Sequence, residues 1–120
     1  MEWLVIACQL VIAISLLNVW LLRTANPTAW RGGDAKNMRE EFAVYGLSPG
    51  FMKLIGFLKI TFAVCLIIGL WVDILTRPAA IGVAALMLGA VAMHVKVKDP
   101  LKKSFPAVTL LVLSILVAIR

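Results

Sequence analysis

The chain has few of the residues from which catalytic and metal sites are built. Its two cysteines, Cys8 and Cys65, do not form the Cys-x-x-Cys pair of a zinc site or of a dithiol redox centre. Its single histidine, His94, leaves it without the three or four ligands of a metal site and without a haem-binding histidine pair. It also has no nucleophile–base pair, no paired carboxylates and no phosphate-binding loop. The sequence therefore favours a protein that is not an enzyme.

Acidic residues are scarce as well, with six Asp and Glu against twelve Lys and Arg, which gives a net charge of +6. In a soluble chain this excess would suggest nucleic acid, but here the basic residues flank long apolar runs. Membrane topology and anionic lipid explain them better. The chain is 62% hydrophobic with a mean hydropathy of +1.01, and its apolar runs leave no room for a separate soluble domain. We predict a single all-α membrane domain over residues 1–120.

Four apolar segments are long enough to cross a bilayer as helices, which takes roughly 20 residues each. They predict a polytopic four-transmembrane-helix bundle with spans at about 3–22, 51–72, 78–95 and 104–119. We read the first as an uncleaved span, because no basic segment precedes it. The last is short, so either it begins near Leu101 or Arg120 extends to the far surface. A short interfacial amphipathic helix is expected at about 35–45, with Asp34 as its N-cap.

The basic residues predict how the bundle is oriented. The termini and the central turn carry only Arg77 and Arg120, so the bias is strong. We expect both basic loops in the cytoplasm and both termini outside, in a bacterial-type plasma membrane, that is, an inner membrane. Four tryptophans near span ends predict an aromatic belt: Trp3, Trp20, Trp30 and Trp71. The two loops on the opposite side carry eight basic residues: Arg23, Arg31, Lys36, Arg39, Lys96, Lys98, Lys102 and Lys103.

Lys59 is the one charge well inside the second predicted span, about 12 Å from its start. A lysine at that depth costs on the order of 2.5–3.5 kcal/mol, so a polar partner is expected. The hypothesis is a cytoplasm-facing polar cavity that holds an anionic headgroup or a quinone ring. The alternative is that Lys59 reaches cytoplasmic water or pairs with a glutamate for structural reasons. The candidate cavity residues are Lys59, Asn18, His94, Glu40, Glu41 and Lys53.

Two features bear on how the spans pack together. Small residues allow close helix approach, and Ala85 with Gly89 forms a small-xxx-small pair. Cys8 and Cys65 lie at similar depth, so a disulfide can form if their helices adjoin, although buried cysteine usually acts as a small hydrophobe. The four predicted packing positions are Gly56, Gly82, Ala85 and Gly89.

Several short motifs occur in a particular order and spacing. They are Glu41-Phe42 with Tyr45-Gly46-Leu47, Gly56-x-x-Lys59, Ala85-Leu86-Met87-Leu88-Gly89-Ala90, and His94 with Asp99-Pro100-Leu101-Lys102. From about residue 31 onward the chain resembles the DoxX-like family of small four-helix membrane proteins. The last motif also resembles the branch of that family that acts as an assembly chaperone for acetylcholine receptors. The resemblance implies a four-helix integral membrane fold; some relatives resemble quinone-linked oxidoreductase subunits and others are chaperones.

Two functions are consistent with these observations. The first is a non-catalytic membrane module that binds a partner membrane protein or a lipid. The alternative, implied by the family resemblance, is a quinone-binding membrane subunit of an oxidoreductase complex, with electrons supplied by another protein. Quinone is thus the one cofactor under consideration. The expected partners are membrane lipids and either a membrane protein or a second copy of the chain, but not nucleic acid.

Overall fold

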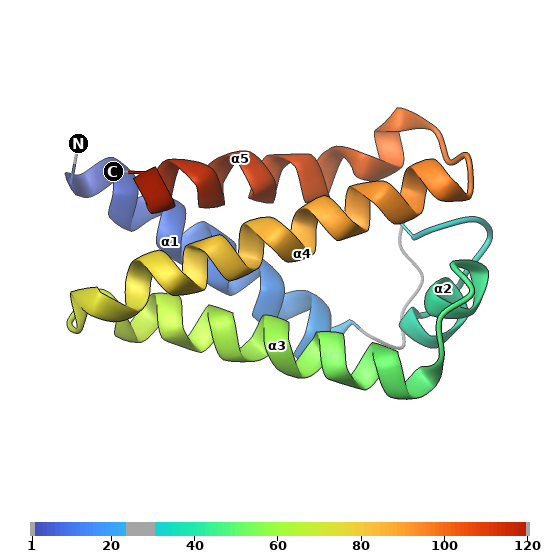
Figure 1. Cartoon of the computed structure of the whole chain (residues 1–120), viewed down its shortest axis with the longest axis horizontal. Coiled ribbons are helices and arrows are strands. Elements are labelled where there is room, and N and C mark those ends of the chain that lie inside the picture. The colour runs from blue at the N-terminus through green and yellow to red at the C-terminus, as the bar shows by residue number, and fades with distance from the viewer. Residues whose placement is uncertain (1, 24–30, 120) are drawn as a thin grey trace.

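The computed structural model describes residues 2–23 and 31–119, and every regular element within them is a helix (Figure 1). Four segments are long and apolar enough to cross a membrane: Trp3–Leu22, Pro49–Ile68, Asp73–Lys96 and Leu101–Ile119. The helices themselves are α1 (Glu2–Leu17), α2 (Met38–Val44), α3 (Pro49–Ile68), α4 (Thr76–Lys96) and α5 (Phe105–Ile119). This confirms the predicted all-α, four-span bundle, with the short helix α2 between the first two spans.

Local capping explains where the helices begin and end. The short helix α2 starts at Met38 and not at Ala35, because Asn37, rather than Asp34, is its N-cap. The Asn37 side chain accepts a hydrogen bond from the Glu40 backbone N–H at 2.8 Å, and the Glu40 carboxylate accepts in return from the Asn37 side-chain amide. The first of these bonds satisfies the Glu40 N–H, one of the groups that a helix start leaves free, and the second holds the two side chains together. Ser48 caps α3 in a similar way by accepting from the Phe51 N–H.

The turns between the spans also differ from the prediction in detail. The helix α3 ends at Ile68, four residues before the expected end at 72, because the chain turns at Gly69 and continues into a short 3₁₀ helix, η2 (Asp73–Leu75). A second 3₁₀ helix, η3 (Leu101–Ser104), leads directly into α5. The fourth apolar segment therefore begins at Leu101, which is the first of the two alternatives; Arg120 lies outside the described residues.

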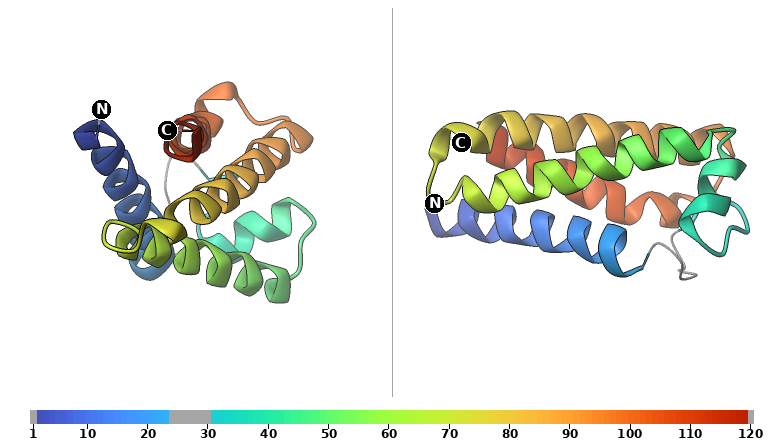
Figure 2. Two further views of the ribbon diagram at one scale, coloured as in Figure 1. Left: turned by 60° about the vertical axis from the view of Figure 1, so that its left-hand side comes forward. Right: turned by 90° about the horizontal axis from the view of Figure 1, so that it is seen from below.

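The four long helices are arranged as two pairs, α1 beside α3 and α4 beside α5. The pairs meet at the end that holds the termini and η2, and they separate toward the end that holds α2 (Figures 1 and 2). A packed core fills the first half of the bundle, where Ile12, Leu66 and Val83 are completely buried. The bundle is thus closed at one end and splayed at the other.

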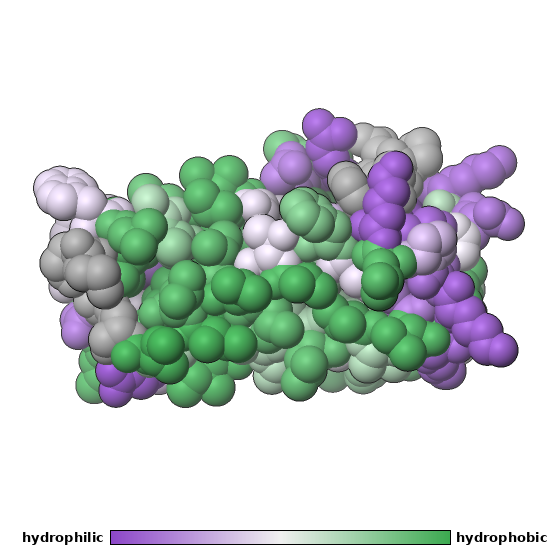
Figure 3. Space-filling view, turned by 90° about the horizontal axis from the view of Figure 1, so that it is seen from above, coloured by the Kyte–Doolittle hydropathy of each residue, from purple (hydrophilic) through white to green (hydrophobic). Residues whose placement is uncertain are grey.

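The surface has the distribution of polarity that a membrane requires. Figure 3 shows hydrophobic side chains over the middle of the molecule and hydrophilic ones gathered at the α2 end. Large apolar side chains such as Leu54, Phe57 and Leu88 are exposed on the surface, which a lipid environment makes favourable. The chain is therefore a multi-pass membrane protein. We name the α2 end, with residues 31–37 and 97–103, the basic end; its placement in the cytoplasm stays a prediction.

The four predicted packing positions divide into two groups. A Cβ at Gly56 would lie 2.6 Å from the Trp20 ring, and one at Gly82 would lie 2.5 Å from the Phe62 ring, so both allow close packing between helices. At Gly89 no atom lies within 4 Å of the corresponding position, and Ala85 is exposed. The expected close approach at Ala85 and Gly89 is therefore wrong within this chain, because the helix pairs have already separated at that level.

Candidate functional site

A cavity of about 880 Å³ lies between the two helix pairs in the splayed half of the bundle. Its walls are built by residues spaced four apart, which places them on one helix face. These are Phe51, Ile55 and Lys59 from α3, and Ala85, Gly89 and Met93 from α4. Met38, Glu41 and Phe42 of α2 close the cavity at the basic end. The walls are mostly apolar, and the polar groups concentrate toward α2.

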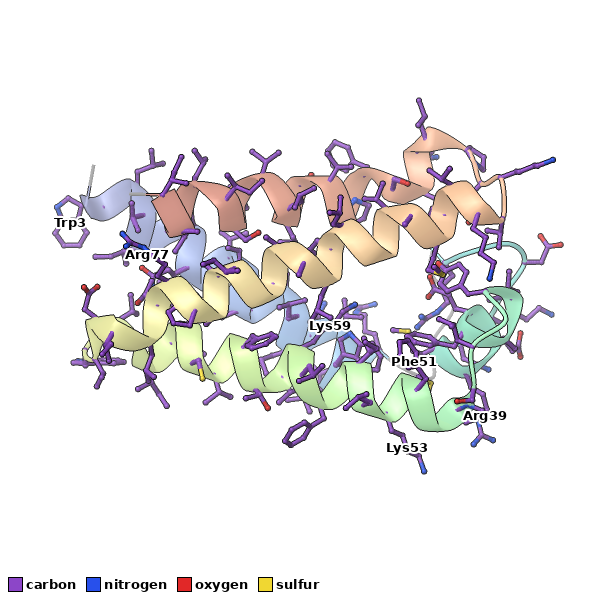
Figure 4. The ribbon with its side chains drawn as sticks, in the orientation of Figure 1. Trp3, Arg39, Phe51, Lys53, Lys59 and Arg77 are labelled. Atoms are coloured by element: carbon purple, nitrogen blue, oxygen red, sulfur yellow. The ribbon has the colours of Figure 1, made fainter. Side chains whose placement is uncertain are left out.

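The Lys59 side chain points from α3 into the space between the helix pairs (Figure 4). Its ammonium lies 5.3 Å from the centroid of the Trp20 ring, within the range of a cation–π interaction. Over residues 2–23 and 31–119, no hydrogen bond or ion pair holds this ammonium. The aromatic face is therefore its main protein partner.

Trp20 is a cavity residue and not part of an aromatic belt. It belongs to a π-helical turn, η1 (Asn18–Leu22), that continues α1, and such turns are frequent at functional sites. Only 8% of Trp20 is exposed, its six-membered ring packs on Gly56, and the Phe42 ring meets it edge-on at 6.1 Å. Its buried indole N–H has no hydrogen-bond partner within residues 2–23 and 31–119. Trp3 and Trp71, by contrast, are largely exposed, as a belt requires; Trp30 lies outside the described residues.

Glu41 is the centre of a hydrogen-bond network at the basic end of the cavity. One carboxylate oxygen forms an ion pair with Arg31 at 3.0 Å. The other accepts from the Tyr45 hydroxyl at 2.6 Å and from the Gly32 backbone N–H at 3.1 Å. Arg31 is only 4% exposed, so this pair is well shielded from water. The network therefore fixes residues 31 and 32 onto α2.

A second network joins this region to the loop between α4 and α5. The Asp99 carboxylate accepts from the Gly33 N–H at 3.0 Å and contacts the His94 ring nitrogen Nδ1 at 2.8 Å. Lys103 donates to the Gly33 carbonyl, and Lys96 donates to the Tyr45 carbonyl at 2.8 Å. Gly33 has a φ of +54°, which favours glycine at this position. These bonds hold the two helix pairs together at their splayed end.

The electrostatics of the Asp99 carboxyl follow from these contacts. Burial by itself raises the pKa of Asp99, but the hydrogen bonds from His94 and Gly33 and the charge of Lys103 outweigh burial and leave the pKa below its usual value. A carboxyl with a lowered pKa stabilises the folded state above its unfolded pKa, about 4, and loses that effect as the pH falls through its folded pKa. The link between the pairs is therefore intact at neutral pH.

Comparison with known proteins assigns the chain to a family. The model of the DoxX-like family matches residues 24–117, which is most of the chain. The protein belongs to the DoxX-like family. Neither a comparison with curated proteins nor one with solved structures gives a match. Lys59, Glu41 and His94 lie inside the matched region of this DoxX-like protein, whereas Asn18 and Trp20 precede it.

The predicted site residues of the DoxX-like protein separate into two sets. Asn18, Lys59, His94 and Glu41 all line the one cavity, although they come from four different helices. Glu40 and Lys53 do not: both are exposed, and Glu40 is occupied in capping α2. Glu40 points away because it precedes Glu41, and adjacent helix positions face different directions.

Three residues that shape the site were not predicted for it from the sequence: Trp20, Arg31 and Tyr45. Trp20 was assigned to the belt by its place near a span end. In the sequence, Tyr45 stands out only as part of a motif of the family resemblance, and Arg31 only among the basic residues that indicate topology. The spacing of Glu41 and Tyr45, four residues apart, was the one available sign of their contact.

The buried phenol of Tyr45 gives a prediction on pH dependence. Burial, followed by hydrogen bonding to Glu41 and the charge of that carboxylate, raises the pKa of Tyr45 well above its usual value of about 10. The pKa of Tyr45 is higher in the folded state than in the unfolded state, so the protonated phenol stabilises the fold fully below pH 10. Above pH 10 the free energy of unfolding falls by about 1.4 kcal/mol per pH unit.

Tyr45 is the only tyrosine, so tyrosinate absorbance reports on it alone. In micelles, the folded protein should show no ionisation at the pH where the unfolded chain titrates, and Tyr45→Phe should lose less stability above pH 10 than the wild type. A normal titration in the folded state would contradict the buried contact.

Proposed function

We propose that this DoxX-like protein is a non-catalytic membrane module that binds one lipid-type amphiphile in the cavity between its helix pairs. The observation that carries the proposal is the cavity itself, at about 880 Å³. Sites for small molecules generally occupy about 300–1,000 Å³, with apolar walls and a few polar groups. The cavity has this composition, with apolar residues along its walls and Lys59 and Glu41 toward one end.

The position of the cavity supports entry from the membrane. Ala85 and Gly89 both line it and are exposed on the surface, on the side where α3 and α4 separate (Figure 1). At the basic end, by contrast, Gly33, Asp99 and Lys103 are joined by hydrogen bonds. An amphiphile that diffuses laterally in the lipid would therefore enter between α3 and α4, with its apolar part among apolar side chains.

The proposal is tested by closing this entrance. Helical side chains lean toward the N-terminus of their helix, so a leucine at position 89 would extend over the entrance toward Ala85. Steric overfilling typically costs about 1–3 kcal/mol, so Gly89→Leu should lower the amount of bound amphiphile by about 5- to 100-fold. The amount per chain is measured by mass spectrometry of an organic extract of the washed, detergent-solubilised protein.

Ala92→Leu is the matched control, because Ala92 is an exposed residue of the same helix that does not line the cavity. It should retain the wild-type amount of amphiphile. Equal loss in both variants, or no bound amphiphile in the wild type, would contradict the proposal. Recovery of a quinone that Gly89→Leu excludes would instead favour the alternative of a quinone-binding oxidoreductase subunit. Recovery of a stoichiometric membrane protein without any small amphiphile would favour a module for partner binding.

A further inference from the structure

Resting on the proposed function, we propose that the bound amphiphile is anionic, with the oxygens of its carboxylate or phosphate bound by the Lys59 ammonium and the Trp20 indole N–H. Both donors belong to residues that line the cavity. They come from α3 and from η1, which lie side by side on one helix pair. The inference names the chemical class of ligand that the proposed function leaves open.

The first observation is that the Lys59 ammonium forms no ion pair and no hydrogen bond with residues 2–23 and 31–119. This ammonium contacts the face of Trp20 and, in the part of the chain that the structure describes, no carboxylate or carbonyl. A charge in a membrane interior is costly unless it is paired or hydrogen-bonded. A cation–π contact contributes about 0.5–2 kcal/mol, which is less than that cost. An oxyanion in the cavity would complete the coordination of this group.

Glu41, the carboxylate whose charge acts on Lys59, is already occupied. Its two carboxylate oxygens accept hydrogen bonds from Arg31, from the Tyr45 hydroxyl and from the Gly32 N–H. Turning Glu41 toward Lys59 would leave the Arg31 guanidinium, which is 4% exposed, without its carboxylate. Breaking the buried Arg31–Glu41 pair would destabilise the protein by more than a new Glu41–Lys59 pair would stabilise it. Glu41 therefore stays with Arg31, and Lys59 remains available to a ligand.

The net charge around the cavity is positive. Among the described residues, its charged lining side chains are Arg23, Arg31, Lys59, Lys103 and Glu41. Arg31 is paired with Glu41 and Lys103 lies beside Asp99, so the positive excess comes from Arg23 and Lys59. A site with low-dielectric walls and a net charge attracts ligands of the opposite sign. An anionic headgroup is favoured over a neutral or cationic one.

The second, independent observation is the indole N–H of Trp20. It is fully buried and has no acceptor among the residues that the structure describes, which is uncommon because buried donors are nearly always hydrogen-bonded. The opposite edge of the same ring packs on Gly56, so the N–H edge lies away from α3. Because Trp20 lines the same cavity as Lys59, a ligand oxygen bound there can accept from this N–H once the ring turns toward it. The two unsatisfied donors together indicate a ligand with more than one acceptor atom.

The test uses pairs of probes of which one carries an oxyanion and the other does not. Delipidated protein in an uncharged detergent is titrated with palmitic acid and with its primary amide, and in a second arm with phosphatidylglycerol and with diacylglycerol, which lacks the phosphate. Binding is followed by native mass spectrometry. We expect at least one anionic probe to bind about 10- to 100-fold more tightly than its uncharged partner, as a charge-assisted hydrogen bond would give.

The two arms distinguish the sources of the oxyanion. Preference for palmitic acid alone identifies a free carboxylate, and preference for phosphatidylglycerol alone identifies a phospholipid headgroup. Either outcome supports the inference. Equal binding within both pairs overturns it, while loss of all binding in Gly89→Leu would still uphold the proposed function. The failure of one can therefore be told from the failure of the other.

Matched lysine variants locate the recognised charge. Lys59→Met should abolish the preference for the anion, so that the variant binds the two members of a probe pair with similar affinity. Lys53→Met removes the same charge from an exposed position of the same helix and should keep the preference. Lys59→Arg should keep much of it, and Trp20→Phe should reduce it. Equal effects of the Lys59 and Lys53 substitutions would overturn the assignment. The comparison of probes on the wild type stands even if a variant does not fold.

Discussion

Replacing Glu41 with glutamine is expected to lower the free energy of unfolding by about 3–5 kcal/mol, which is the usual cost of removing one partner from a buried ion pair. Arg31 would keep its charge in a site that is 4% exposed, with a neutral amide in place of the carboxylate. The amide also has one acceptor oxygen fewer for the Tyr45 hydroxyl and the Gly32 N–H. Unfolding of micelle-solubilised protein by dodecyl sulfate, followed by tryptophan fluorescence, measures the loss.

The neighbouring glutamate provides the control for this experiment. Glu40→Gln removes the same charge one residue earlier, from a side chain that is exposed and that caps α2. Glu40→Gln should lower the free energy of unfolding by no more than about 1 kcal/mol, since a glutamine can also serve in a capping box. If the two substitutions cost the same, the Arg31–Glu41 pair does not stabilise the fold in the manner that the structure indicates.

Leu66→Ala is expected to lower the free energy of unfolding by about 2–5 kcal/mol, because it leaves a cavity in the packed half of the bundle. Leu66 is completely buried, in a core with Ile12, Val83 and Val117. Around it the helix pairs are in contact and cannot move closer to fill the space. The same unfolding measurement in micelles gives the value.

Leu54→Ala is the comparison, because Leu54 belongs to the same helix and is 51% exposed on the surface that faces lipid. Lipid chains can fill the space left by this substitution, so the expected cost is at most about 1 kcal/mol. A large loss for Leu54→Ala would show that this face is covered by another protein surface. A small loss for Leu66→Ala would contradict a tightly packed closed end.

Different interactions hold the helix pairs together at the closed end and at the splayed end of the bundle. Packing of Ile12, Leu66 and Val83 holds the helix pairs together at one end, and hydrogen bonds of Gly33 and Tyr45 to the α4–α5 loop hold them at the other. The interior between these two connections does not need to be filled. A membrane bundle built in this way can keep a cavity without losing its fold.

The sequence by itself determined the four spans, the short helix α2 and the all-helical fold. Backbone N–H and C=O groups must be hydrogen-bonded within the protein inside a bilayer, so each long apolar run is expected to form a helix. It also indicated which polar residues share a depth, because rise per residue fixes distance along each helix. That is why Asn18, Lys59 and His94 are candidates for a single cavity in the same half of the bundle, and the structure places all three around one cavity.

Only the tertiary structure decided which side chains meet. Depth along a helix gives no information about rotation or about the partner helix, so Glu41 could not be told from Glu40 in the sequence. The burial of Trp20 and the separation of the pairs beside Gly89 follow from how α1 and α4 cross their neighbours. Helix contacts in lipid depend on shape and on a few hydrogen bonds rather than on hydrophobicity, and a hydropathy pattern records neither.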